Sequence, residues 1–172
     1  MSLLSRLFQH RDPREAMLPL YTAIVSEGRR AHWYAQGGVP DTLDGRFDMI
    51  AAILSLVLLR LEGEPDKKQE SVWLTETFID DMDGQLRQIG IGDVVVGKHI
   101  GRMMSALGGR ITAYRDAFAD AGALPDTLVR NLYRGDAPQS AALAHVEAAL
   151  RQFQSGLATV PTNRLLAGDL PR

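Results

Sequence analysis

The longest apolar run of the chain, from Met49 to Leu59, is the feature that most limits how it can fold. Ser55 alone interrupts this run, and Arg60 closes it. Its apolar residues fall all round a helix rather than along one face, which is typical of a helix that is buried on every side. The run is well short of the ~20 residues that a membrane-spanning helix needs. We therefore expect a central helix that is wrapped by other parts of the same chain.

Apolar residues recur at helical spacing through most of the remaining sequence, and few segments show the alternation of a half-buried strand. Proline and glycine residues divide this pattern into separate helices. The expected helices cover about 3–8, 13–36, 41–62, 70–89, 94–120, 125–134 and 138–155. The pattern predicts an all-α fold, a single compact multi-helix domain of about six to seven helices, with a short amphipathic N-terminal helix.

The chain length of 172 residues fits one domain of ordinary size. We divide it into an amphipathic N-terminal segment (1–12), a helical domain (13–158) and a C-terminal tail (159–172). Because no clear helical pattern continues after Val160, we expect this tail to be loosely ordered.

The first helix is amphipathic, and one of its faces is apolar. That face carries the residues Leu3, Leu4, Leu7 and Phe8. Arg6 and Arg11 lie near the opposite, polar side. Such a segment can lie on an anionic membrane surface, dock on the body of its own chain, or fray. We keep the four apolar residues as candidates for membrane contact.

Charge and cysteine content exclude several classes of site. The chain has no cysteine, so it has no disulfide, thiolate metal site or thiol nucleophile. Its formal net charge of −2 gives no global reason to expect specific nucleic-acid binding. Its beginning shows neither a secretory signal nor a long transit peptide. We expect a cytoplasmic protein, in peripheral contact with the inner face of the cytoplasmic membrane if the first helix binds lipid.

Two motifs are close to known ligand-binding motifs, but each lacks residues that the ligand requires. The segment Gly92–His99 nearly matches the phosphate-binding loop G-x-x-x-x-G-K-[ST], yet His99 stands where Ser or Thr must hold magnesium. The segment Asp80–Gly84 invites a calcium-loop interpretation, yet the first and twelfth ligands would be Ile79 and Gly90. We interpret the first as the start of a helix and the second as an acidic helix face.

The remaining residue patterns provide no catalytic site. No two of the 4 histidines have the i+3 or i+4 spacing of a metal-binding pair. His99 and Met103 share a helix face, and from there they cannot sit on opposite sides of one haem. We therefore predict a protein that is not an enzyme and has no cofactor and no metal. The alternative is a small-molecule or haem-binding helical protein, or an unrecognised enzyme.

Small residues recur every four positions along the helix expected over 94–120. They are Gly97, Gly101, Ser105 and Gly109. Glycine inside a helix costs up to ~1 kcal/mol relative to alanine, so this line predicts that another backbone approaches closely. That backbone belongs either to the same chain or to the helix of a partner. Three cationic residues border the line and could meet a carboxylate or a phosphate: Lys98, Arg102 and Arg110.

Three stretches of the sequence together resemble the ubiquinol–cytochrome c chaperone family. They are Gly38–Asp48, Asp80–Lys98 and Arg130–Gly135, and their order and spacing fit that family over roughly residues 15–135. The resemblance implies an all-helical assembly factor of a bacterial respiratory chain. The implied client is cytochrome b or another subunit of the bc1 complex, with the ribosome or a small partner protein as further contacts. Leu107-Gly108 departs from the family pattern, which has aromatic residues at this point.

We select candidates for partner binding from the charged residues of these stretches and from the borders of the small-residue line. They are Asp44, Arg46, Asp80, Asp83, Arg87, Lys98, Gly101, Arg102 and Arg110. We assign no catalytic residue and no metal ligand.

Overall fold

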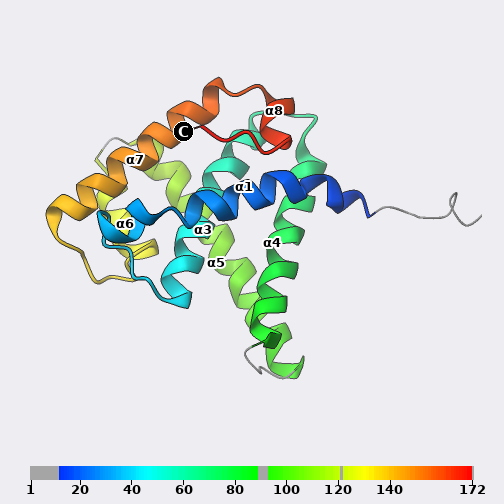
Figure 1. The fold of residues 1–172 in the computed structure, drawn as a ribbon, viewed down its shortest axis with the longest axis horizontal. Helices are drawn as coiled ribbons and strands as arrows, with labels where there is room; N and C mark the ends of the chain where they lie inside the picture. The colour runs from blue at the N-terminus through cyan, green and yellow to red at the C-terminus, as the bar shows by residue number, and fades with distance from the viewer. Residues whose placement is uncertain (1–11, 89–92, 121, 172) are drawn as a thin grey trace, which may run out of the picture.

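The computed structural model describes residues 12–88, 93–120 and 122–171, with the backbone alone at 86–88 and 93–100. Within these residues the fold is all-α and forms one compact domain, as expected (Figure 1). The elements are the 3-10 helix η2 (Pro13–Met17) and the α-helices α1 (Leu18–Gly28), α2 (Ala31–Ala35), α3 (Leu43–Glu62), α4 (Lys68–Gln88), α5 (Asp93–Ala119), α6 (Leu124–Asn131), α7 (Ser140–Thr159) and α8 (Thr162–Leu166). None of the described helices is long and apolar enough to cross a membrane.

The central helix of the fold is α3, as its apolar run predicts. Every residue from Asp48 to Leu58 is buried. The helix packs against α1, α4, α5 and α7, so neighbours surround it (Figure 1). At its start the Thr42 hydroxyl accepts a hydrogen bond from the Gly45 amide at 3.1 Å, which caps the first turn.

A projecting hairpin is formed by α4 and α5, which run antiparallel and extend together beyond the rest of the domain (Figure 1). Their apolar stripes face the core, as the helical spacing predicts. The buried residues of these stripes are Leu74, Phe78 and Met82 on α4 and Leu107 and Tyr114 on α5. Because this stripe faces inward, the opposite side of α5 is left open to solvent.

The single helix expected over 13–36 is wrong, because the chain forms η2, α1 and α2 there. Gly28 ends α1 so close to α3 that a Cβ on it would lie 2.9 Å from Cγ1 of Ile50. Beyond the break, the Trp33 indole N–H donates to the Glu27 carbonyl at 2.9 Å, and the Tyr34 hydroxyl donates to the Gly28 carbonyl at 2.7 Å. Aromatic side chains thus satisfy carbonyl groups at the end of α1.

The C-terminal tail is ordered, contrary to our expectation for the residues after Val160. The short helix α8 buries Leu165 and packs against α1. Pro171 lies against α7, since a Cβ on Gly156 would be 2.5 Å from the Pro171 Cβ. The only sequence signal for this helix is the apolar pair Leu165-Leu166 within one turn. Contact with the rest of the fold, rather than helical periodicity, holds the helix in place. The amphipathic N-terminal helix lies outside the described residues.

Candidate functional site

A buried ion cluster joins the start of α3 to α5 and to the turn after α6. The Asp48 carboxylate is fully buried and accepts hydrogen bonds from Arg110 Nη2 and from Arg134 Nε, the latter at 2.6 Å. Arg134 Nη1 also pairs with Asp44 at 2.7 Å. The Arg110 guanidinium lies over the Phe47 ring, 5.4 Å from its centroid. One carboxylate therefore holds three separate parts of the chain together.

Electrostatics explain why this cluster has two cations for its buried anion. Burial raises the pKa of the Asp48 carboxyl, and the hydrogen bond from Arg134 and the charge of Arg110 oppose that rise. The hydrogen bond with Asp48 in turn raises the pKa of Arg134. Arg134 adopts a left-handed conformation with φ of 56°, which costs an L-residue roughly 1–2 kcal/mol. Its two ion pairs keep it in that conformation.

Three candidates for partner binding therefore make contacts within the chain. Asp44 and Arg110 belong to the ion cluster. Arg46, which is exposed, pairs with Asp41 at 2.7 Å. These side chains position the start of α3, and they lie apart from the open face of α5 that is described below.

The acidic candidate Asp80 lies on α4 beside the first described residues of the chain. Asp80 pairs with Arg14 of η2 at 2.6 Å. The neighbouring Asp81 accepts a hydrogen bond from the Tyr21 hydroxyl at 2.6 Å, so η2 and α1 are both attached to α4. Asp83 is half-buried on the same helix. This acidic face thus has a structural use, because it anchors the N-terminal part of the domain.

The line of small residues on α5 faces open space. A Cβ added at Gly101 or Gly109 would meet nothing within 4 Å, and Ser105 between them is exposed. Close approach by another part of the chain that the structure describes is therefore wrong for these two glycines, and a partner's helix is the other alternative. Arg102 is exposed beside the line. The side chains of Lys98 and Arg87 and the surroundings of Gly97 lie outside the described part of the structure.

An apolar groove of about 350 Å³ lies between α3, α4 and α5. Its apolar lining residues are Leu58, Val72, Ile79, Met104 and Ile111, and we call it the α4–α5 groove. Val72 and Met104 are 49% and 40% exposed, so the groove presents two large apolar side chains to solvent. Glu62 and Glu76 also line it. Such a surface is typical of sites that bind an apolar or amphipathic helix.

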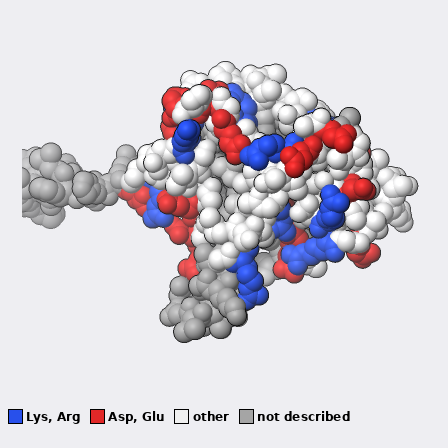
Figure 2. All heavy atoms as spheres, turned by 180° about the vertical axis from the view of Figure 1, so that it is seen from behind, with Lys and Arg blue, Asp and Glu red and all other residues white. Residues whose placement is uncertain are grey.

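The charges on one face of the molecule are unevenly spread. Figure 2 shows a band of mixed charges across the upper half of this face and a second charged cluster at the lower right, with an uncharged area between them. An uncharged area bordered by charges is compatible with a protein interface, whose centre is poor in charged residues.

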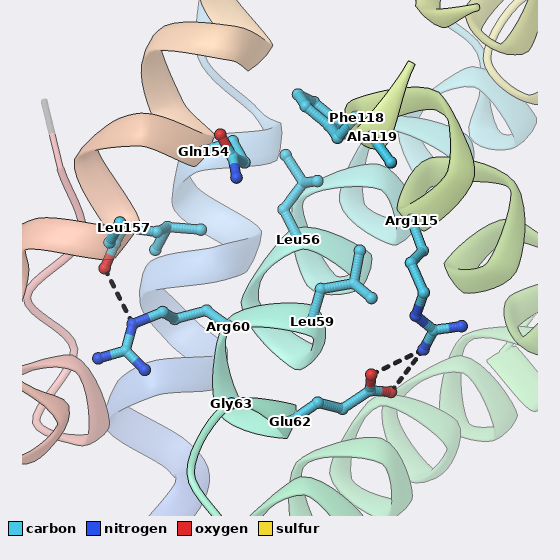
Figure 3. A pocket seen from close by; sticks show the side chains of 11 residues that line it. Leu56, Leu59, Arg60, Glu62, Gly63, Arg115, Phe118, Ala119, Gln154 and Leu157 are labelled. Atoms are coloured by element: carbon cyan, nitrogen blue, oxygen red, sulfur yellow. Dashed lines mark hydrogen bonds and ion pairs between the residues drawn. The ribbon is translucent and has the colours of Figure 1, made fainter.

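A second cavity, of about 640 Å³, lies between α3, α5 and α7 (Figure 3). Leu56 and Leu59 point into it, with Arg60 and Arg115 on either side (Figure 3). Arg115 Nη2 donates to both carboxylate oxygens of Glu62, at 2.9 and 2.7 Å, and Arg60 donates to the Leu157 carbonyl at 3.2 Å. Its volume falls within the range of small-molecule sites, so this cavity is where the small-molecule alternative would place its ligand.

Two histidines that lie far apart in the sequence meet between α2 and α7. His32 Nδ1 and His145 Nε2 are 3.1 Å apart, and one donates a hydrogen bond to the other according to tautomer. His32 is half-buried and stacks against Trp33 at 4.1 Å between ring centroids. Burial, followed by the charges of Arg30 and His145, lowers the pKa of His32. The folded protein therefore favours the neutral ring.

This pair predicts a fall in stability on mild acidification. Because the folded-state pKa of His32 lies below its unfolded value of about 6.5, its contribution is present above that pH and is lost as the pH falls. Denaturant unfolding between about pH 7.5 and pH 5.5 should show a decreasing free energy of unfolding. His32→Gln, which has no proton to gain, should have a flatter profile. Identical slopes for the two proteins would contradict this assignment.

Side chains that could hold a metal ion are not grouped in the described part of the chain. No group of three or more histidine, aspartate or glutamate side chains that could hold a metal ion occurs there. The His99 side chain, on which the haem alternative depends, lies outside the described side chains. So do the candidates for membrane contact, Leu3, Leu4, Leu7 and Phe8.

Sequence reasoning missed Asp48, Arg134 and the histidine pair as positions that organise the fold. One signal was available for Asp48, because a carboxylate that directly precedes an all-round apolar run must be buried and needs a partner. The partners of that carboxylate lie 62 and 86 residues away, so residue spacing cannot identify them.

The fold is a helical domain with an open apolar groove and a structural ion cluster. A profile of the ubiquinol-cytochrome C chaperone family matches residues 35–171, and the chain belongs to that family. The structure is similar to the crystal structure of the Cbp3 homolog from Brucella abortus, with 31% sequence identity, a TM-score of 0.79, and coverage of 98% of this chain and 95% of that chain. Comparison with curated proteins gives no significant match. The family resemblance inferred from the three sequence stretches is thus confirmed.

Proposed function

We propose that this protein is a non-enzymatic assembly chaperone of ubiquinol–cytochrome c reductase, the bc1 complex, and that its client is cytochrome b during biogenesis. Membership of the ubiquinol-cytochrome C chaperone family is the observation that carries the proposal. The fold supports it, since a helical domain with an open apolar groove suits the binding of another protein.

The client docks, in this proposal, along the α4–α5 groove and the open face of α5. Gly101 and Gly109 leave room for the backbone of a client helix to approach, as small residues do between membrane helices. Val72 and Met104 offer exposed apolar contact, and methionine adapts its shape to different side chains. Arg102 borders this face, and Lys98, Arg87 and Asp83 belong to the same hairpin.

Loss of the protein gives the most general test of this function. Deleting the gene in the organism that encodes it should lower the amount of cytochrome b and prevent assembly of the bc1 complex. Immunoblots of cytochrome b and native gels of membranes measure the two effects. Unchanged cytochrome b and normal assembly would show that the proposed function is wrong.

Replacing glycines of the small-residue line with alanine should raise the stability of the fold and lower the binding of the client. Gly101→Ala with Gly109→Ala should stabilise the fold, by up to about 1 kcal/mol for each site, because alanine is the better helix former and neither Cβ meets an obstacle. The same change should reduce the recovery of cytochrome b, because the methyl groups occupy the surface where the client backbone approaches. Thermal unfolding and affinity isolation measure the two effects.

The chain offers a matched control on α4. Gly84 also has nothing within 4 Å of its Cβ position, and helical spacing places it away from the groove side of that helix. Gly84→Ala should therefore stabilise the fold without any loss of client. Full recovery of cytochrome b by the α5 double variant would exclude docking on this face.

Further contacts complete the proposal. The apolar face of Leu3, Leu4, Leu7 and Phe8 would bring the protein to the inner face of the cytoplasmic membrane, where cytochrome b is inserted. The ribosome and a small partner protein are additional partners. Flotation with anionic vesicles tests the lipid contact, and a variant with aspartate at Leu4 and Leu7 should no longer float.

The alternative function, small-molecule or haem binding, is supported by the cavity between α3, α5 and α7. A visible absorption spectrum with and without added haem tests it. A shifted Soret band that disappears in His99→Ala would favour this alternative, and an unchanged spectrum would count against the haem version.

A further inference from the structure

The α4–α5 groove is short compared with a helix that spans a membrane. Its described lining residues run from Ser71 to Ile79 on α4 and from Met104 to Ile111 on α5. Each stretch is about two helical turns, or ~11 Å, long. A membrane-spanning helix of ~20 residues is ~30 Å long. The groove can therefore hold about two turns of such a helix at a time, and its charges decide which turns these are.

The charged side chains among the described lining residues are the carboxylates of Glu62 and Glu76. Glu76 follows Val72 by four residues and precedes Ile79 by three, so all three lie on one side of α4. Its side chain is exposed and makes no hydrogen bond or ion pair with a described side chain. An unpaired anion thus lies directly beside exposed apolar surface.

Two described guanidinium groups interact with these carboxylates, and both have other roles. Arg115 of α5 donates to both carboxylate oxygens of Glu62, in an ion pair whose two side chains are about half exposed. The pKa of Arg14 is raised first by its hydrogen bond with Asp12 and only last by the charge of Glu76. The charge of Glu76 is therefore left without a partner, and the groove has a net negative charge.

A carboxylate beside an apolar groove distinguishes the parts of a membrane helix from one another. The middle of such a helix is apolar and offers no charge to Glu76, whereas its cytoplasmic end is enriched in lysine and arginine. We infer that the α4–α5 groove takes the basic, cytoplasmic end of a membrane helix of the client, and that Glu76 and Glu62 select this end by its charge. This inference deepens the proposed function and rests on it, because it names the part of the client that the groove holds.

Two synthetic peptides and the purified full-length protein test this selection. The peptides share an apolar leucine-alanine segment of about two to three helical turns, and they carry either lysines or glutamates at both ends. Fluorescence anisotropy of a dye on each peptide measures its affinity. The lysine peptide should bind about tenfold more tightly at low salt, because the carboxylates attract it and repel the glutamate peptide. Salt at ~1 M, where the screening length is only ~3 Å, should bring the two affinities together.

A pair of charge variants locates the effect in the groove. Glu76→Gln should lower the preference for the lysine peptide to about threefold, since one of the two carboxylates is removed. Asp116→Asn removes an equal charge from an exposed position on α5 that helical spacing places away from the groove side, and it should leave the preference unchanged. Both changes are at exposed positions, and equal melting temperatures would show that both variants fold.

The possible failures have different meanings. Equal affinities for the two peptides would overturn the charge selection and leave an apolar docking groove, and with it the proposed function, in place. An equal effect of Glu76→Gln and Asp116→Asn would also overturn it, because the overall charge of the protein would then explain the preference. Binding of neither peptide would contradict the docking of a client helix in this groove as well as its selection.

Discussion

Replacing Asp48 with asparagine should lower the free energy of unfolding by about 3–5 kcal/mol, because it leaves the buried guanidinium group of Arg110 without its anion. Arg110 would lose its ion partner in a site where its side chain is only 12% exposed. Arg134 would lose one of the two contacts that hold its left-handed conformation. In a domain of this size, the loss corresponds to a fall in melting temperature of about 10 °C.

Two further variants make this result specific. Asp41→Asn removes the partner of Arg46 at an exposed site, and it should leave the melting temperature nearly unchanged. Asp48→Asn should lower the free energy of unfolding less in an Arg110→Met background than in the native chain, because no buried cation is then left without its partner. Should Asp48→Asn be as mild as Asp41→Asn, the ion cluster would not hold the three elements together.

Substituting alanine for Gly45 should be the second severe change, with a loss of about 3 kcal/mol. A Cβ at this position would lie 2.0 Å from the Pro40 carbonyl oxygen and 2.9 Å from its carbon. Those atoms belong to the backbone, so relief requires the chain before α3 to move. That movement would also disturb the Thr42 cap, which receives its hydrogen bond from the Gly45 amide.

Denaturant unfolding of Gly45→Ala beside Gly84→Ala measures this effect. Both glycines lie in helices, but only Gly45 has a neighbour within 4 Å of its Cβ position. We expect opposite signs, with a loss of stability at Gly45 and a gain at Gly84. A stabilising Gly45→Ala would contradict the close approach of Pro40.

The helices could be predicted where their own residues determine them. The apolar run of α3 needs burial on every side whatever surrounds it, and the stripes of α4 and α5 define their inward faces. The break after Gly28 could not be predicted, because contact with Ile50 and the bond from Trp33 to Glu27 arise only in the folded chain. The order of the C-terminal tail depends in the same way on contacts with α1 and α7.

The candidate site was predictable in part, for a similar reason. The periodicity of the glycines on α5 indicated a surface made for close approach, but not whether the neighbour lay inside the chain. The sequence predicts Arg110 as a partner-binding residue because it borders the line of small residues, whereas its ion partner Asp48 is 62 residues away and leaves no local signal. The His32–His145 pair, 113 residues apart, has no sequence signal at all. Local sequence patterns thus predict the open face of α5, whereas only the three-dimensional structure shows which charged residues form ion pairs within the fold.

Site-specific photo-cross-linking in respiring cells tests the central claim most directly. A photoreactive amino acid is placed at Met104 in the α4–α5 groove, and in a matched strain at Ala148 on α7, and the captured proteins are identified by mass spectrometry. We predict that cytochrome b is captured from Met104 and not from Ala148. Capture of cytochrome b equally from both positions, or from neither, would contradict a chaperone that holds its client in this groove.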